Sequence, residues 1–189
     1  MLKVFTISDI RSWAPCYDPT RYLPEGWQGT ALDILDCEDC PAVDRLRVVL
    51  REECIDDRTI RLFAVWCARQ ALALIDNPDP RSVAALDTAE RFAVGEATVD
   101  ELAAASAAAW YAAWYAARAA DRDADRDAAW AAAWDDARDA AWDAANVAVR
   151  AAASGAASAA AKEAAVAAQV LYLRLLVSQS EPTVTLKLA

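Results

Sequence analysis

Helical periodicity dominates the order of hydrophobic and polar positions in the middle of this chain. Within residues 58–75, apolar side chains recur at helical spacing at Ile60, Phe63, Ala64, Cys67, Ala71 and Leu74. Because an α-helix turns once in 3.6 residues, this spacing places them on one side of a helix. The pattern therefore predicts a core helix over residues 58–75, with Asp56 or Asp57 as its N-cap.

Start and stop signals predict two shorter helices before it. Thr30 and Asp33 have the spacing of a capping box, in which a hydroxyl and a carboxylate satisfy backbone N–H groups of the first turn. This helix is predicted to run to about Asp39, because Pro41 cannot continue it. A second short helix is predicted over residues 43–54.

Capping residues, proline and glycine predict both ends of the next helix and the start of the one after it. Asp79 followed by Pro80 combines an N-cap residue with proline at the first helical position. Gly95 lies where a C-cap glycine belongs. Thr98 and Glu101 again have capping-box spacing. The sequence therefore predicts one helix between Pro80 and Gly95 and the start of another at Thr98.

An alanine-rich stretch follows and extends to residue 154. A single helix over residues 98–154 would be roughly 85 Å long, whereas a compact domain of this size has a radius of gyration of about 16 Å. The break is expected within residues 121–128, DRDADRDA, where like charges fall four residues apart. We therefore predict helices at about residues 99–119, 124–153 and 156–178.

Tryptophans recur throughout this alanine-rich stretch. Trp110 and Trp114 fall on one bulky helix face with alanine on the rest of the helix, and Trp130 and Trp134 share their face with alanine. These four indoles are predicted to fill the core between closely approaching helices. Trp142 differs, because on a helical wheel it falls beside Asp135, Arg138 and Asp139. Two interpretations stay open: these four residues form an anchor for a partner protein, or another part of the chain covers Trp142.

The ends of the chain depart from the helical pattern. Residues 2–7 and 183–188 alternate as strands do, and a minimal sheet that pairs the two termini is one arrangement this allows. Residues 12–29 contain three prolines and two glycines and are predicted to be irregular. The aromatic residues of this loop either pin it onto the helices or form a recognition surface: Trp13, Tyr17, Tyr22 and Trp27.

These patterns predict an all-α fold, a single-domain multi-helix bundle with long Ala/Trp-rich helices. The 189 residues suit one domain with its own core. Its predicted parts are a strand and aromatic loop (1–30), short and medium helices (31–95), the Ala/Trp-rich helices (96–178) and a C-terminal tail or strand (179–189).

Net charge and hydropathy limit the classes of partner that the protein is expected to bind. The formal net charge of −10 argues against binding to nucleic acid phosphates or to an anionic membrane, and favours a basic protein partner. The start of the chain does not resemble a secretory signal, and the longest uncharged apolar stretch, residues 102–117, is too short for a membrane span. We therefore expect a cytoplasmic protein; assembly with a second copy and binding of a small nucleotide stay open.

Catalytic and metal-binding signatures are missing from the sequence. The chain contains no histidine, which removes Ser-His and Cys-His pairs and the commonest transition-metal ligand. Cys37 and Cys40 form the one C-x-x-C, and no second pair at zinc-finger spacing accompanies it, although Cys16, Cys54 and Cys67 are further thiols. Glycine-rich phosphate loops are also missing. We therefore expect a protein without catalytic residues, metal or cofactor.

Residues 61–105 and the alanine-rich helices after them resemble the Imm5-like family of immunity proteins of bacteria, phages and prophages. The shared features are R-L-F-A-x-x-C-A, a D-P-R-S-x-x-A-L helix, a glycine and a T-x-x-E-L helix start. The resemblance covers about residues 61–150. It implies a helical protein that neutralises a toxin or effector by binding it.

The segment WAPCYDPTRYLPEGWQGTALDIL, residues 13–35, resembles phage-encoded relatives in particular. That resemblance implies a second kind of role, a phage-encoded inhibitor of a host defence system. Such an inhibitor would act as an acidic decoy or by sequestering a nucleotide signal. The arginines interleaved with the carboxylates weaken the decoy form, since a mimic of DNA needs rows of one charge.

Overall fold

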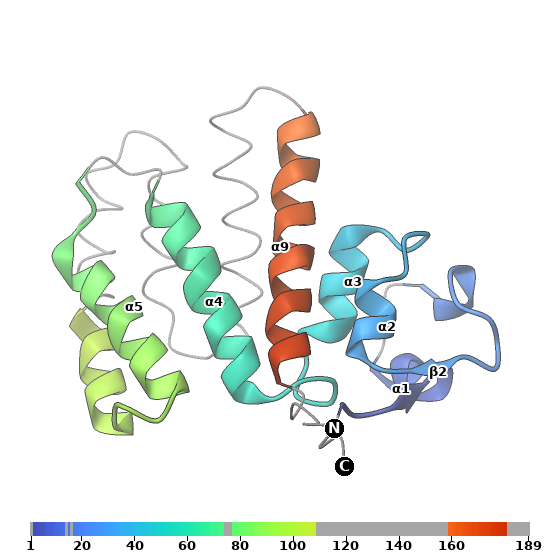
Figure 1. The fold of residues 1–189 in the computed structure, drawn as a ribbon, viewed down its shortest axis with the longest axis horizontal. Coiled ribbons are helices and arrows are strands. Elements are labelled where there is room, and N and C mark those ends of the chain that lie inside the picture. Colours follow the sequence, from blue (N-terminus) through green and yellow to red (C-terminus); the bar gives the residue numbers. More distant parts are fainter. Residues whose placement is uncertain (1, 14, 16, 74–76, 109–158, 181–189) are drawn as a thin grey trace, which may run out of the picture.

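The computed structural model describes residues 2–13, 15, 17–73, 77–108 and 159–180, and this part of the chain is mostly helical, with one two-stranded sheet (Figure 1). The all-α prediction is confirmed. Residues 99–108 are also helical. The other helices are α1 (Ile7–Ser12), the 3-10 helix η1 (Pro19–Arg21), α2 (Ala31–Leu35), α3 (Ala42–Val49), α4 (Asp57–Leu72), α5 (Pro80–Ala93) and α9 (Ala159–Gln179).

Four of the predicted helix starts are confirmed by their hydrogen bonds. The Asp56 carboxylate accepts from the Thr59 backbone N–H at 2.8 Å, so Asp56 is the residue that caps α4. Asp79 caps α5 in the same way, accepting from the N–H of Arg81 at 2.8 Å. The Thr30–Asp33 box opens α2. In the second box, the Thr98 N–H donates to the Glu101 carboxylate at 2.7 Å.

The helix ends were predicted less well. Gly95 is in the left-handed region at φ +81° and its N–H donates to the Phe92 carbonyl, as expected after α5. However, α2 stops at Leu35 and α3 at Val49, well before Asp39 and Cys54. The chain leaves the helix after Val49 because the turn that follows buries three more side chains in the core: Leu50, Cys54 and Ile55.

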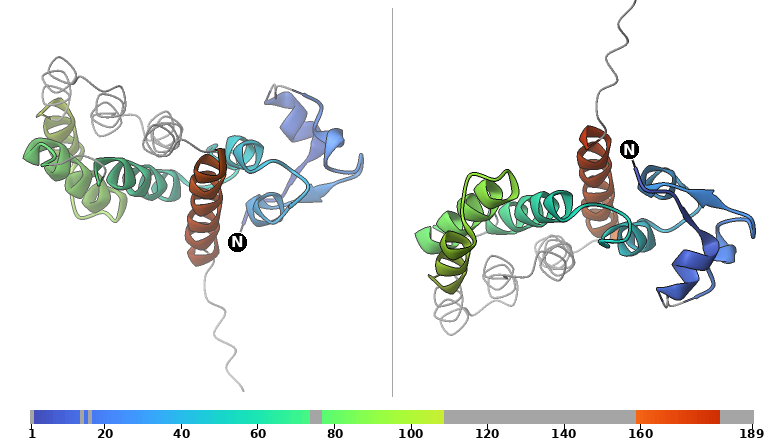
Figure 2. Two further views of the ribbon diagram at one scale, coloured as in Figure 1. Left: turned by 90° about the horizontal axis from the view of Figure 1, so that it is seen from above. Right: turned by 90° about the horizontal axis from the view of Figure 1, so that it is seen from below.

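Helix α9 lies at the centre of the arrangement. It packs against α2 and α3 on one side and against α4 on the other, and α5 covers the outer side of α4 (Figures 1 and 2). The N-terminal segment with α1 and the sheet lies beyond α2. Elements more than a hundred residues apart in sequence are therefore neighbours.

The hydrophobic core extends across these contacts. Phe63 of α4 and Leu173 of α9 are both fully buried, in one cluster that reaches back to Phe5. Trp66 of α4 stacks on Tyr172 of α9 with ring centroids 4.4 Å apart. At the other side of α9, large side chains of α2 and α3 complete the cluster: Ile34, Leu35, Leu46 and Val49.

The small sheet differs from the one that the sequence suggested. Strand β1 (Phe5–Thr6) pairs antiparallel with β2 (Gln28–Gly29), inside the N-terminal segment. Only two residues of the predicted strand 2–7 are extended in the sheet, because Thr6 and Asp9 form a capping box that starts α1 at Ile7. The C-terminal residues 183–188 lie outside the described part of the chain, as do residues 109–158.

Several predictions fall in those ranges. They include the core tryptophans, the break within residues 121–128, the helix over 124–153 and the candidate anchor at Asp135, Arg138, Asp139 and Trp142. The flanks agree with the sequence: residues 99–108 are helical as expected, and α9 corresponds to the predicted helix 156–178. None of the described helices combines the length and apolar character that a membrane crossing requires.

Candidate functional site

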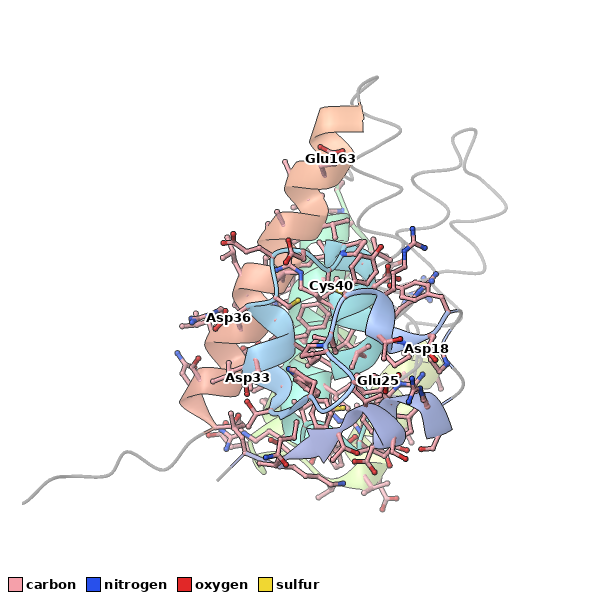
Figure 3. All side chains as sticks on the ribbon, turned by 90° about the vertical axis from the view of Figure 1, so that its right-hand side faces the viewer. Asp18, Glu25, Asp33, Asp36, Cys40 and Glu163 are labelled. Atoms are coloured by element: carbon pink, nitrogen blue, oxygen red, sulfur yellow. The ribbon has the colours of Figure 1, made fainter. Side chains whose placement is uncertain are left out.

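An apolar pocket lies between the N-terminal loop and the helices α2 and α3. Its volume is about 60 Å³. Most of its wall is apolar, and its polar groups are confined to a few side chains. The wall is formed by Ile10, Pro15, Tyr17, Pro19, Tyr22, Leu23, Ile34, Cys40, Asp44, Arg47 and Val48. Figure 3 views this side of the molecule, with Cys40 near the centre of the view.

Local caps and ion pairs hold the loop that carries the two tyrosines. The Asp18 carboxylate accepts from the Thr20 N–H at 2.9 Å and so starts η1, with Pro19 at its first position. Arg11 of α1 pairs with Asp18 at 3.0 Å and with Glu25 at 3.2 Å. These contacts tie both halves of the loop to α1, so the pocket has a defined rim.

Tyr17 and Tyr22 form this rim together with an arginine. Their rings meet edge to face, with centroids 5.6 Å apart. The Arg21 guanidinium lies 5.6 Å from the centroid of one ring and 5.4 Å from that of the other. Both tyrosines are half-buried. The rim therefore presents aromatic edges and one cation to solvent.

The polar groups of the pocket stay protonated or paired at neutral pH. Burial, followed by a hydrogen bond to Asp44, raises the pKa of Tyr17. Burial also raises the pKa of the Cys40 thiol to about 11. The Asp44 carboxylate forms an ion pair with the Arg47 guanidinium of the same helix, 3.8 Å away. Thiolate and phenolate nucleophiles are therefore scarce here, and the pocket is suited to holding an apolar group.

The four aromatic residues predicted for this loop divide into two pairs. Trp13 and Trp27 both contact Phe5, with ring centroids 5.4 and 5.6 Å from it, and pack against the core. They pin the loop, as the first interpretation stated. Tyr17 and Tyr22 instead line the pocket, as the recognition interpretation requires. The pinning interpretation thus describes the two tryptophans, and recognition by the two tyrosines stays a prediction.

The far wall of the pocket was missed by the sequence interpretation. It comes from the turn after α2 and from α3, where Cys40, Asp44 and Val48 follow one another at intervals of four residues. Asp44 and Val48 lie one turn apart on the same face of α3, and their spacing was a usable signal.

A second hollow of about 270 Å³ lies where α4 begins and α9 ends. Its lining is mixed, with Arg58, Leu62 and Leu176 beside polar groups. The Thr59 hydroxyl is 2.9 Å from Asp56 and 3.1 Å from the Ser180 hydroxyl. Because these polar groups already satisfy each other, this hollow is a weaker candidate than the apolar pocket.

The four cysteines that the structure describes do not gather into a metal site. Among the described residues, no group of three or more potential ligands is close enough to hold an ion. Cys54 and Cys67 are buried in the core, and Cys37 and Cys40 are half-buried in the turn between α2 and α3. All four are free thiols.

Comparisons of the chain with protein-family models, with curated proteins and with solved structures found no match. The candidate site therefore stands on its own geometry.

Proposed function

We propose that this protein is a non-enzymatic binding protein that neutralises a toxin or effector by direct contact, in the manner of an immunity protein. The observation that carries the proposal is the apolar pocket with a rim of Tyr17, Tyr22 and Arg21. Tyrosine and arginine are enriched among residues that contribute most to protein interfaces. The resemblance of residues 61–150 to Imm5-like proteins supports the same role.

The chemistry of the pocket favours an apolar side chain of a partner as its occupant. A small apolar hollow loses water readily when such a side chain enters, which is the usual arrangement at an interface hot spot. The scarcity of thiolate and phenolate supports binding over turnover. The protein therefore acts by occupying its partner's surface.

Charge supports a basic partner. The chain has a formal net charge of −10, and the exposed carboxylates Glu38 and Asp39 lie in the turn next to Cys40. Opposite charge on the partner would speed association and orient it over the pocket. A basic toxin or defence effector fits this field.

Tyr17→Ala and Tyr22→Ala are expected to weaken binding to the partner toxin or effector by about 30-fold or more, the effect of losing a hot-spot side chain. Isothermal titration measures the affinity, and rescue of growth during co-expression measures neutralisation. Tyr17→Phe keeps the ring and loses only the hydrogen bond to Asp44, so it is expected to bind nearly as wild type.

Leu171→Ala serves as the matched control, because Leu171 is a large apolar residue that is 67% exposed on α9 and lies outside the pocket wall. It should leave the affinity unchanged. The proposal is wrong if both tyrosine variants, folded by circular dichroism, bind and neutralise as well as the wild type does.

A second candidate is a sponge for a nucleotide signal, the counter-defence role. The observation in its favour is the guanidinium of Arg21 over two tyrosine rings, with Arg47 in the pocket wall. Aromatic faces and arginines together bind nucleobases and phosphates. The small volume and apolar wall rank this candidate below the protein partner.

Thermal-shift measurements with cyclic mono- and dinucleotides separate the two candidates. A sponge saturated at 100 times its Kd is expected to gain about 2.7 kcal/mol, which raises the Tm of a chain of this length by roughly 5–10 °C. Arg47→Ala should abolish that rise. Unchanged melting with every nucleotide at millimolar concentration would eliminate the sponge.

A further inference from the structure

The turn between α2 and α3 brings two thiols together. The Cys40 backbone N–H donates to the Cys37 carbonyl at 3.1 Å, which closes a four-residue turn over Glu38 and Asp39. In such a turn the first and last Cα atoms lie within about 7 Å, and a disulfide needs Cα atoms about 4.4–6.8 Å apart. The turn thus brings the two Cα atoms to about the range that a disulfide requires.

Both thiols are accessible and near each other. Cys37 and Cys40 are half-buried, whereas Cys54 and Cys67 are enclosed in the core. The charge of Cys37 contributes to the raised pKa of Cys40, as expected for neighbouring sulfur atoms. The turn is fixed on both sides, by α2 before it and by Pro41 and α3 after it. Reaction of the two thiols therefore requires little movement of the backbone.

Cys40 also belongs to the wall of the apolar pocket. It lines the pocket together with Tyr17, Asp44 and Val48, and it is among the groups that raise the pKa of Tyr17. Cys37 is not part of that wall. A bond between the two sulfur atoms would draw the Cys40 side chain toward Cys37 and change the surroundings of Tyr17.

We propose that Cys37 and Cys40 form a dithiol site that reacts with small-molecule disulfides such as oxidised glutathione, and that the resulting Cys37–Cys40 disulfide reshapes the apolar pocket. The inference does not depend on the proposed function, since it concerns the turn and the wall of the pocket alone.

The reaction is a pair of thiol–disulfide exchanges. The Cys37 thiolate attacks one sulfur of the small disulfide, forms a mixed disulfide and displaces one thiolate. The Cys40 thiolate then attacks the sulfur of Cys37, forms the Cys37–Cys40 bond and displaces the second thiolate. The two released thiolates take up the two protons that the cysteines lose. The protein dithiol is oxidised by two electrons, and the small disulfide is reduced to two thiols.

The order of attack follows from the surroundings of the two thiols. Burial raises the pKa of Cys40 to about 11, so its thiolate is scarce in solution. Once Cys37 carries the mixed disulfide, Cys40 is held beside it, and proximity compensates for that scarcity. Cys40 is therefore the resolving thiol.

Incubation of the full chain with oxidised glutathione, acid quench, alkylation and tryptic digestion tests the proposal by mass spectrometry. Cleavage after Arg21 and Arg45 gives one peptide, residues 22–45, that contains both cysteines. This peptide is expected to become lighter by two hydrogen atoms and to lose both alkylatable thiols. Cys40→Ser should stop at the mixed disulfide on Cys37, heavier by one glutathionyl group.

A second measurement follows the pocket. With isotope-labelled tyrosine, the ring resonances of Tyr17 and Tyr22 are expected to shift on oxidation of the wild type. Cys37→Ser is the matched control, because Cys37 is not part of the pocket wall and the variant cannot form the bond; its tyrosine resonances should stay in place. The shift therefore reports the disulfide and not a general effect of the oxidant.

Three results would overturn the proposal. The peptide 22–45 could keep both alkylatable thiols at high oxidised glutathione. Cys40 could cross-link instead to Cys16, which lies in the tryptic peptide 12–21. The disulfide could form while the resonances of Tyr17 and Tyr22 remain unmoved, which would remove its effect on the pocket.

Discussion

Phe63→Ala is expected to lower the free energy of unfolding by about 3–5 kcal/mol, the usual cost of emptying a large buried aromatic position. Phe63 is fully buried at the centre of α4, in the cluster that joins α4 to α9. Its ring also lies 6.4 Å from Trp66, which itself stacks on Tyr172. The loss is large because the packed helices on either side close a cavity only in part.

Urea unfolding followed by circular dichroism measures this change. Val99→Ala is the control, since Val99 is 66% exposed and its truncation should stay within about 0.5 kcal/mol of wild type. Phe63→Leu, which keeps most of the apolar volume, should fall between the two. A cost below about 1 kcal/mol for Phe63→Ala would contradict the placement of this side chain in the core.

Alkaline pH is expected to destabilise the protein through its buried thiols. Burial raises the pKa of Cys54 to about 12 and raises that of Cys67 as well. The Cys54 thiol also donates to the Val48 carbonyl at 3.2 Å. In the unfolded chain a cysteine has a pKa of about 8.5. Above that pH the folded state therefore holds more protons than the unfolded state.

The sign and size of the effect follow from proton linkage. The stability that each protonated thiol contributes is fully present below the unfolded pKa and is lost as the pH rises toward the folded pKa. Each thiol then removes about 1.4 kcal/mol per pH unit. The free energy of unfolding should accordingly fall steeply between about pH 9.5 and pH 11.

Urea unfolding under reducing conditions at several pH values tests this dependence. Cys67→Ala removes one of the titrating groups, so its slope should be shallower than that of the wild type by about 1.4 kcal/mol per pH unit. Tyrosine ionisation contributes equally to both slopes, and the small cavity that alanine leaves does not depend on pH, so neither affects the difference between the slopes. Parallel slopes for the two proteins would show that the Cys67 thiol titrates in the folded state as it does in water.

The helices could be predicted where the sequence contains explicit local signals. Asp79 with Pro80, Gly95, and the boxes at Thr30 and Thr98 each act through hydrogen bonds within a few residues, so their meaning does not depend on distant parts of the chain. The ends of α2 and α3 are different. The turn after α3 buries Leu50, Cys54 and Ile55 in the core cluster, which joins residues far apart in sequence, and such burial leaves no local signal.

The candidate site shows the same division. The sequence indicated Tyr17 and Tyr22 as candidates, because a loop of that length without secondary structure is uncommon unless it is functional or packed by its own side chains. It could not separate them from Trp13 and Trp27, since the four side chains differ only in what lies beside them in space. Nor did it predict strand β2, whose two residues, Gln28 and Gly29, have no strand preference of their own. The Cβ of any other residue at position 29 would lie 2.6 Å from the Trp27 ring, so glycine there permits a close contact.

The central position of α9 has a consequence for how the protein is made. During synthesis the ribosome completes α2, α3 and α4 first, and about a hundred residues separate the end of α4 from the last buried residue of α9. At a translation rate of about 5–20 residues per second, the nascent helices wait roughly 5–20 s for the element that covers them. Throughout that interval the apolar side chains that will contact α9 are exposed to chaperones and to neighbouring nascent chains on the same mRNA.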